Sequence, residues 1–145
     1  MNKPLDRQPV QAILLLLACA AVYLYLLLLA LGWQARIPQP VFLAHLVADE
    51  KARFWTWDQF THLLTVLAVS VPFAWALTRL LSRRLALAGA VVVAPAVIWM
   101  ALDYFSIPAE LPQAPPALDF FYGLDTAAVA AILPLLAWLL RPARR

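Results

Sequence analysis

Several ionisable residues of this sequence lie where its hydrophobic segments begin or end. Asp58 and His62 are four residues apart, a spacing that places both side chains on one face of a helix. Asp103 comes late in a following hydrophobic segment. If these hydrophobic segments cross a membrane, ionisable groups within them are costly, and their presence in such segments indicates a functional site. We expect helix ends to bring together, in an outer-facing pocket, the ligand-binding residues Asp58, His62, Asp103, Asp119, Asp125 and Thr126.

Three kinds of chemistry fit such a pocket. A mixed set of imidazole and carboxylate ligands suits Zn or Mn, and the candidate metal ligands are His62, Asp58, Asp103 and Asp125. Acid–base catalysis on a lipid-linked substrate would use His62 to exchange protons, with Asp58 or Asp103 orienting the imidazole. The third possibility is binding of a cationic or polar headgroup without catalysis.

A purely structural explanation competes with these three. Aspartate at a helix N-terminus satisfies free backbone N–H groups, which would account for Asp58, Asp119 and Asp125. It does not account for His62, or for Asp103 at the C-terminal end of a helix. A bis-histidine haem between His45 and His62 is disfavoured, because the segment around His45 is expected to lie on the membrane surface.

The composition excludes most classes of soluble protein. Of 145 residues, 65% are hydrophobic and 13% are charged, and the mean hydropathy is +0.81. Soluble domains have about 45–50% apolar and about 25% charged residues. The same high hydrophobic content excludes a disordered chain. A nucleic-acid-binding module is also excluded, since the net charge of +3 comes from segregated charges rather than from one basic face. The sequence predicts a single integral membrane domain over residues 1–145.

Four hydrophobic segments are long enough to cross a membrane. They span about residues 10–33, 57–80, 85–104 and 122–140, and each meets the requirement of about 20 apolar residues for a transmembrane helix. The segments are continuously apolar rather than alternating, so they are expected to be helices. Thr56 and Gln59 resemble a capping box and predict that the second helix begins at Trp57. The predicted fold class is therefore all-α, a bundle of four transmembrane helices.

The two outer segments that connect these helices have different characters. Residues 41–54 mix apolar and charged positions and predict a short amphipathic helix on the extracytoplasmic surface. Residues 105–121 contain four prolines and predict an extended, irregular segment that could cover the helix ends. Gly32 and Gly89 would allow close packing against another membrane protein or a second copy of the chain.

The basic residues predict the orientation. One side of the membrane would carry eight Lys and Arg residues and the other only three, namely Arg36, Lys51 and Arg53. Since the side richer in Lys and Arg is cytoplasmic, both termini are expected in the cytoplasm. The small size and simple layout suggest a bacterial inner membrane.

One stretch of the sequence resembles a known group of membrane proteins. Residues 57–64, with Asp58 and His62, resemble the Asp-x-x-x-His helix start of VanZ-like and YjdF-type small membrane proteins. Asp103 and the run from Tyr122 to Thr126 stand at places similar to the later acidic positions of those families. The resemblance covers about residues 56–140. It implies a role at the cell envelope, where VanZ is linked to glycopeptide resistance, and names no reaction.

Three functions remain open from the sequence. The first is an envelope protein whose outer-facing polar pocket binds a lipid headgroup, a small ligand or a partner membrane protein. The second is a membrane-embedded enzyme, metal-dependent in one version, that acts on a lipid or a lipid-linked envelope precursor. The third is a structural subunit of a membrane complex. Transport is disfavoured because no charge lies centrally in any predicted helix.

Overall fold

The computed structural model describes residues 9–81, 84–106 and 116–141, with side-chain surroundings for residues 10–81, 84–105 and 120–141. All regular secondary structure in these ranges is helical, which confirms the all-helical fold class. The helices are α1 (Pro9–Gln34), α2 (Leu43–Leu46), α3 (Glu50–Leu80), α4 (Leu85–Ser106) and α5 (Pro116–Leu139).

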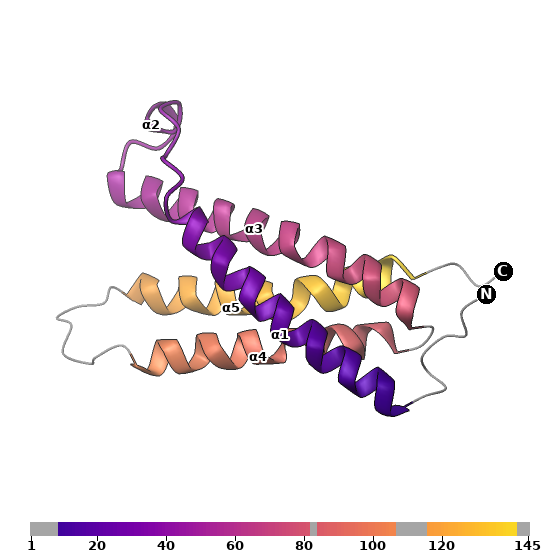
Figure 1. Cartoon of the computed structure of the whole chain (residues 1–145). Coiled ribbons are helices and arrows are strands. Elements are labelled where there is room, and N and C mark those ends of the chain that lie inside the picture. The colour runs from indigo at the N-terminus through magenta and orange to yellow at the C-terminus, as the bar shows by residue number, and fades with distance from the viewer. Residues whose placement is uncertain (1–8, 82–83, 107–115, 142–145) are drawn as a thin grey trace.

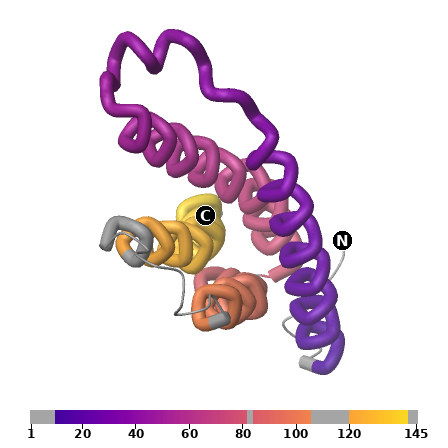
Figure 2. Tube along the Cα trace, turned by 90° about the vertical axis from the view of Figure 1, so that its left-hand side faces the viewer, coloured from indigo at the N-terminus to yellow at the C-terminus, as the bar shows by residue number. Residues whose placement is uncertain are grey.

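The four long helices form a bundle whose helices alternate in direction (Figure 1). Helix α1 begins and α5 ends at one end of the bundle, while α2 marks the opposite end, which we call the α2 end. Helices α4 and α5 run nearly along one axis, α3 is inclined to them, and α1 crosses the bundle obliquely (Figures 1 and 2). Figures 1 and 2 show that α1 starts near α4 and finishes beside α3. Helix α5 packs between α3 and α4.

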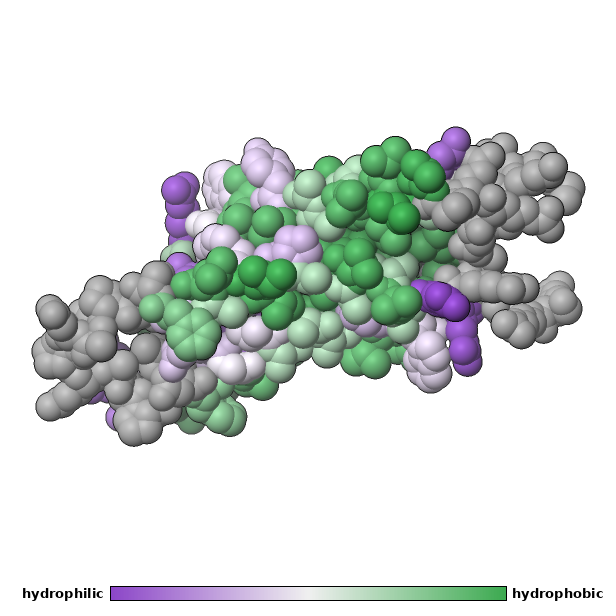
Figure 3. Space-filling model, turned by 90° about the horizontal axis from the view of Figure 1, so that it is seen from below, coloured by the Kyte–Doolittle hydropathy of each residue, from purple (hydrophilic) through white to green (hydrophobic). Residues whose placement is uncertain are grey.

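Each of the four long helices is long and apolar enough to cross a membrane. Most of their apolar surface faces outward: only 17% of the most hydrophobic window of α1, and 17% of that of α5, is buried inside the bundle. On the face shown in Figure 3, apolar side chains cover most of the middle and hydrophilic ones lie toward the ends. Such a large exposed apolar surface is typical of helices that face lipid or another protein.

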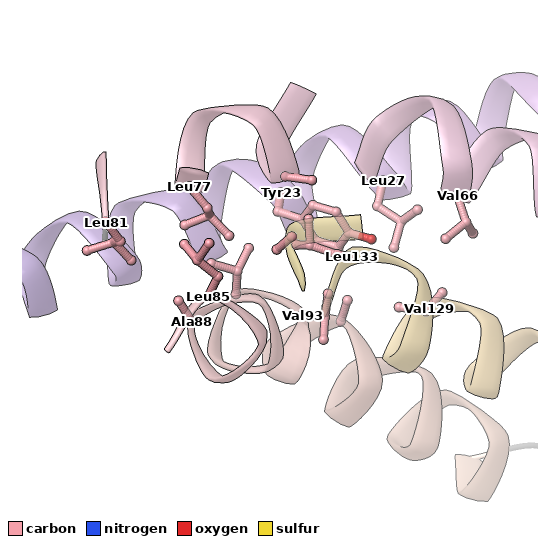
Figure 4. Packing of buried hydrophobic residues seen from close by; sticks show 14 of the residues in the cluster. Tyr23, Leu27, Val66, Leu77, Leu81, Leu85, Ala88, Val93, Val129 and Leu133 are labelled. Carbon is pink, nitrogen blue, oxygen red and sulfur yellow. The ribbon is translucent and has the colours of Figure 1, made fainter. Parts of the chain in front are cut away.

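The interior is built from side chains that recur every three or four residues along each helix, the spacing that places residues on one helix face (Figure 4). Tyr23 of α1 is fully buried, and its hydroxyl lies 3.1 Å from Oγ of Ser70 in α3, where the two groups share a hydrogen bond. The other inward-facing residues include Leu27 of α1, Val66, Ala74 and Leu77 of α3, Val92 and Ala96 of α4, and Val129, Leu133 and Ala137 of α5.

Gly89 allows α4 and α5 to approach closely. A Cβ atom at Gly89 would lie only 2.9 Å from Cα of Pro134 in α5, so glycine is needed for this crossing. The sequence predicted that Gly89 would pack against another protein, but in the structure it packs against α5 of the same chain. Gly32 differs, because nothing lies within 4 Å of the position of its missing Cβ.

The predicted start of the second helix was wrong. Helix α3 begins at Glu50, seven residues before Trp57, and Asp49 is its N-cap: Asp49 Oδ1 accepts a 2.7 Å hydrogen bond from the Ala52 N–H. Thr56 caps nothing, because its hydroxyl donates to the Ala52 carbonyl within the helix. The single amphipathic helix predicted over residues 41–54 is also wrong, since only Leu43–Leu46 is a separate helix and residues 50–54 belong to α3.

The last helix also begins earlier than predicted. Helix α5 starts at Pro116, where a proline is well suited because the first helical N–H needs no partner within the helix. Residues 116–121, expected to be irregular, are therefore helical. The rest of the predicted proline-rich cover, residues 107–115, lies outside the described residues.

Candidate functional site

The inward-facing side of the helices changes from apolar to polar at the α2 end. In α3, His62 comes four residues before Val66 and continues the same buried face. In α5, Asp125 likewise comes four residues before Val129. Helix α1 ends with Gln34, which is buried with 7% of its surface exposed. Helical periodicity thus turns these polar side chains toward one another at one end of the bundle.

His62 occupies the centre of this region. Its side chain is only 9% exposed, and its Nε2 atom lies 3.7 Å from Oδ1 of Asp125, whose side chain is 18% exposed. That separation is too long for a hydrogen bond, and Nε2 has no other hydrogen-bond partner among the described residues. The structure therefore places an imidazole nitrogen and a carboxylate face to face with neither bonded to the other.

Asp58 and Gln59 complete the group that we call the polar cluster, which consists of Asp58, Gln59, His62 and Asp125. Asp58 lies close enough to His62 and Asp125 to interact electrostatically with both. Gln59 approaches the carboxylate of Asp125, but its buried Nε2 does not reach the geometry of a hydrogen bond to any described group. The cluster therefore holds two carboxylates. It also holds two buried nitrogen atoms, His62 Nε2 and Gln59 Nε2, that have no hydrogen-bond partner among the described residues.

Gln34 braces the cluster from α1. Its Nε2 donates to Oδ1 of Asp58 at 3.1 Å and lies 3.3 Å from the Asp58 carbonyl oxygen. These contacts join the last residue of α1 to α3, so the oblique course of α1 is fixed against α3 at this end. One carboxylate oxygen of Asp58 is thereby oriented by the fold.

Asp103 joins this region indirectly. It is exposed near the end of α4, and the phenol of Tyr122 in α5 donates a hydrogen bond to its Oδ2. The rings of Tyr122 and Tyr104 lie 5.2 Å apart between centroids. Tyr122 also interacts electrostatically with Asp125, so it stands between Asp103 and the polar cluster. Asp103 thus lies at the rim rather than beside His62.

No contact with the cluster is described for two other predicted residues, Thr126 and Asp119. The hydroxyl of Thr126 donates to the Tyr122 carbonyl at 2.8 Å, a bond within its own helix. Asp119 falls in the first turn of α5, and its side chain lies outside the described residues. His45 is exposed on α2, while His62 is buried in the bundle.

The helix-capping explanation of Asp58 and Asp125 is wrong. Asp58 is the ninth residue of α3 and Asp125 the tenth of α5, because both helices begin earlier than their hydrophobic segments. At these depths the backbone N–H groups are already bonded within the helix. Neither aspartate therefore serves a helix end: the Asp58 carboxylate accepts from Gln34, and that of Asp125 faces His62.

The predicted metal ligands take part in separate contacts. Among the residues whose side chains are described, namely 10–81, 84–105 and 120–141, no three His, Cys, Asp or Glu side chains are arranged to hold a metal ion. His62 and Asp125 form a pair, Asp58 is oriented by Gln34, and Asp103 is held by Tyr122. Such an arrangement can accept protons or cations at its carboxylates and exchange hydrogen bonds at its nitrogen atoms.

Three residues of this region were not among the predicted site residues. Gln34 could have been found by extending the inward-facing positions of α1, since it lies seven residues after Leu27, two helical turns. Gln59 was interpreted only as a capping residue. Tyr122 was used only as the start of a helix, and no local pattern signals its bond to Asp103, which lies 19 residues away.

Comparison with known proteins gives no relative from which a function could be transferred. No protein-family model matches the chain, and neither a curated protein nor a solved structure is significantly similar to it. The resemblance of residues 56–140 to VanZ-like and YjdF-type proteins stays a prediction, and the site has to be interpreted from its own geometry.

Proposed function

We propose that this protein is an integral membrane protein that binds the polar headgroup of a lipid at the α2 end of its four-helix bundle. The observation that supports the proposal best is the buried His62, whose Nε2 faces Asp125 at 3.7 Å and has no hydrogen-bond partner among the described residues. A polar group that approaches both atoms from one side could form a hydrogen bond to each of them.

The cost of these buried groups supports a ligand over a structural role. A buried polar group without a hydrogen bond costs about 1–3 kcal/mol, and here the atoms concerned are His62 Nε2 and Gln59 Nε2. An apolar residue at position 62 would continue the face formed by Val66 and would avoid that cost. A polar ligand that bonds to these atoms would offset the cost, and it would explain why polar residues occupy these positions.

The position of the cluster along α3 fits a headgroup. With 31 residues, α3 is about 46 Å long at 1.5 Å per residue, which exceeds the roughly 30 Å thickness of a hydrocarbon core. Counting about 20 residues back from Leu80 reaches Thr61, so His62 would lie within the first turn of the hydrocarbon and Asp58 just outside it.

Tryptophan–arginine pairs support the same placement at both boundaries. At the α2 end, the Arg36 guanidinium lies 5.5 Å from the ring centroid of Trp33. At the other end, Arg79 lies 5.2 Å from Trp75, and Arg141 lies 4.8 Å from Trp138. Tryptophan and arginine at helix ends are typical of membrane interfaces.

The orientation follows the distribution of basic residues. In the proposed arrangement both termini are cytoplasmic and the α2 end faces outward, in a bacterial inner membrane. The polar cluster would then meet lipids of the outer leaflet of that membrane. A partner protein or a second copy could still cover the exposed sides of the helices.

A second candidate function uses the same groups. A carboxylate that is hydrogen-bonded to an imidazole can orient it for proton transfer. His62 Nε2 and Asp125 Oδ1 lie 3.7 Å apart, so a small movement would join them, and the bound lipid or lipid-linked precursor could be a substrate. Release of a lipid fragment from the purified protein, abolished by His62→Ala, would identify the enzyme.

Lipid retention tests the proposal directly. The wild type, His62→Ala and His45→Ala would be purified in mild detergent, and the lipid that remains bound would be quantified by mass spectrometry. His45 is the matched control because it is exposed on α2, outside the cluster. We expect one headgroup class to be enriched in the wild type and in His45→Ala, and to fall about tenfold or more in His62→Ala.

Folding has to be separated from binding in this experiment. Circular dichroism and gel-filtration profiles of the three proteins should agree, and Asp125→Asn, which keeps the shape of the side chain, provides a second variant. Identical lipid profiles in the wild type and in both folded cluster variants would refute the proposal.

A further inference from the structure

We infer that the polar cluster selects a lipid whose headgroup carries a protonated primary amine. This inference rests on the proposed lipid-binding function and adds the chemical class of the headgroup. It is carried by the buried Nε2 of His62, which faces the carboxylate of Asp125 at 3.7 Å and has no hydrogen-bond partner among the described residues. A second carboxylate, that of Asp58, lies one helical turn before His62 in α3 and is oriented by Gln34.

The charge balance of the cluster calls for a cation. Asp58 and Asp125 interact electrostatically with each other, and no lysine or arginine contacts either of them among the described residues. The nearby Arg36 lies over the ring of Trp33 instead. Because half-buried carboxylates without a cation are costly, a positively charged ligand stabilises the arrangement, whereas an anionic headgroup would be repelled.

The hydrogen-bond geometry calls for a cation that carries N–H groups. Asp125 Oδ1 and His62 Nε2 lie 3.7 Å apart, so one ammonium nitrogen can sit about 2.8 Å from both and donate to the carboxylate and to a neutral imidazole. Asp58, which interacts electrostatically with both His62 and Asp125, adds a second negative charge near this position. A quaternary ammonium has the charge and lacks these donors.

The remaining buried nitrogen fits the rest of such a headgroup. Gln59 Nε2 can only donate, and it has no hydrogen-bond partner among the described residues. An aminophospholipid supplies phosphate and ester oxygen atoms a few bonds from its amine. The cluster would thus pair its carboxylates with the amine and its amide with an oxygen acceptor of the same molecule.

A methylation series of lipids tests this inference on the wild-type protein. Phosphatidylethanolamine, its N-methyl and N,N-dimethyl derivatives and phosphatidylcholine would be compared with identical acyl chains, with phosphatidylglycerol as the anionic member. Binding to the delipidated protein would be measured by native mass spectrometry. Each methyl group removes one N–H donor and keeps the charge, so affinity should fall along the series and reach about tenfold or more between its ends.

Two aspartate variants separate the cluster from general electrostatics. Asp125→Asn should remove the preference for the primary amine. Asp49→Asn should keep it, because it removes a charge at the same end of α3 while asparagine still caps the helix. Asp58→Asn is the second cluster variant if Asp125→Asn does not fold.

The outcomes distinguish this inference from the proposed function. Equal or stronger binding of phosphatidylcholine or phosphatidylglycerol, lost in His62→Ala, would overturn the amine inference and keep the lipid-binding proposal. Binding of free phosphoethanolamine without binding of any phospholipid would support the amine chemistry and overturn the lipid proposal. No binding that depends on His62 would overturn both.

Discussion

Gly89→Ala tests the close crossing of helices α4 and α5. The new Cβ would lie 2.9 Å from Cα, and 3.1 Å from N, of Pro134. Both are backbone atoms that cannot rotate away, while comfortable carbon–carbon contacts lie near 3.5–4.0 Å. Helices α4 and α5 would have to separate by several tenths of an ångström along a crossing that Leu133 and Val92 also fill.

The expected size follows from two opposing effects. Overpacking of a filled interior costs about 1–3 kcal/mol, while alanine is better than glycine in a helix by about 0.5–1 kcal/mol. We therefore expect Gly89→Ala to lower the free energy of unfolding by about 1–2 kcal/mol. Gly32→Ala is the matched control, because nothing lies within 4 Å of its added Cβ and only the helix preference should act.

Reversible unfolding in mixed micelles, followed by circular dichroism, would measure both variants. The two should shift in opposite directions, with Gly89→Ala less stable and Gly32→Ala equal to or more stable than the wild type. If Gly89→Ala were as stable as Gly32→Ala, α4 and α5 would not cross at Gly89 and Pro134, and the reasoning would fail.

Three further predictions concern the capping, the interior and the orientation of the bundle. Asp49→Ala should destabilise the protein by about 1 kcal/mol through loss of the N-cap of α3, whereas Asp49→Asn should be nearly neutral in the same unfolding assay. Tyr23→Phe and Ser70→Ala should each cost about 0.5–1.5 kcal/mol, and the double variant should cost less than their sum, because both remove one hydrogen bond. The orientation can be tested with Arg36→Cys and Arg84→Cys, each in a Cys19→Ser background. An impermeant maleimide added outside intact cells should label Arg36→Cys and should not label Arg84→Cys. The reverse labelling pattern would show that the proposed orientation is inverted.

The four long helices were predictable because the length of a continuous apolar run can be read directly from the sequence. Continuous apolar runs of about 20 residues leave few other structures, since lipid satisfies no backbone group. The starts of α3 and α5 were not predictable from hydropathy. Helix α3 begins among charged residues at Glu50, and α5 begins at Pro116, a proline that was counted with the irregular segment. What sets the start of α3 is the Asp49 cap, a local contact that hydropathy ignores.

The candidate site was predictable in part. The spacing of Asp58 and His62 places both side chains on one helix face. Both are ionisable residues near the end of a long apolar segment, where such residues are costly, and this made them candidates. The partner of each residue was not predictable. His62 faces Asp125, Asp58 receives the amide of Gln34, and Tyr122 bonds to Asp103, all through contacts between different helices.

The sequence by itself thus determined the helical class, the four segments able to cross a membrane, and the end of the bundle at which polar residues accumulate. The tertiary structure decided which of those residues meet, because the rotation and crossing of each helix depend on side chains far away in the chain, such as Gly89 against Pro134. A shift of one residue turns a helix by about 100°, so the contact between His62 and Asp125 exists only once the whole bundle is packed.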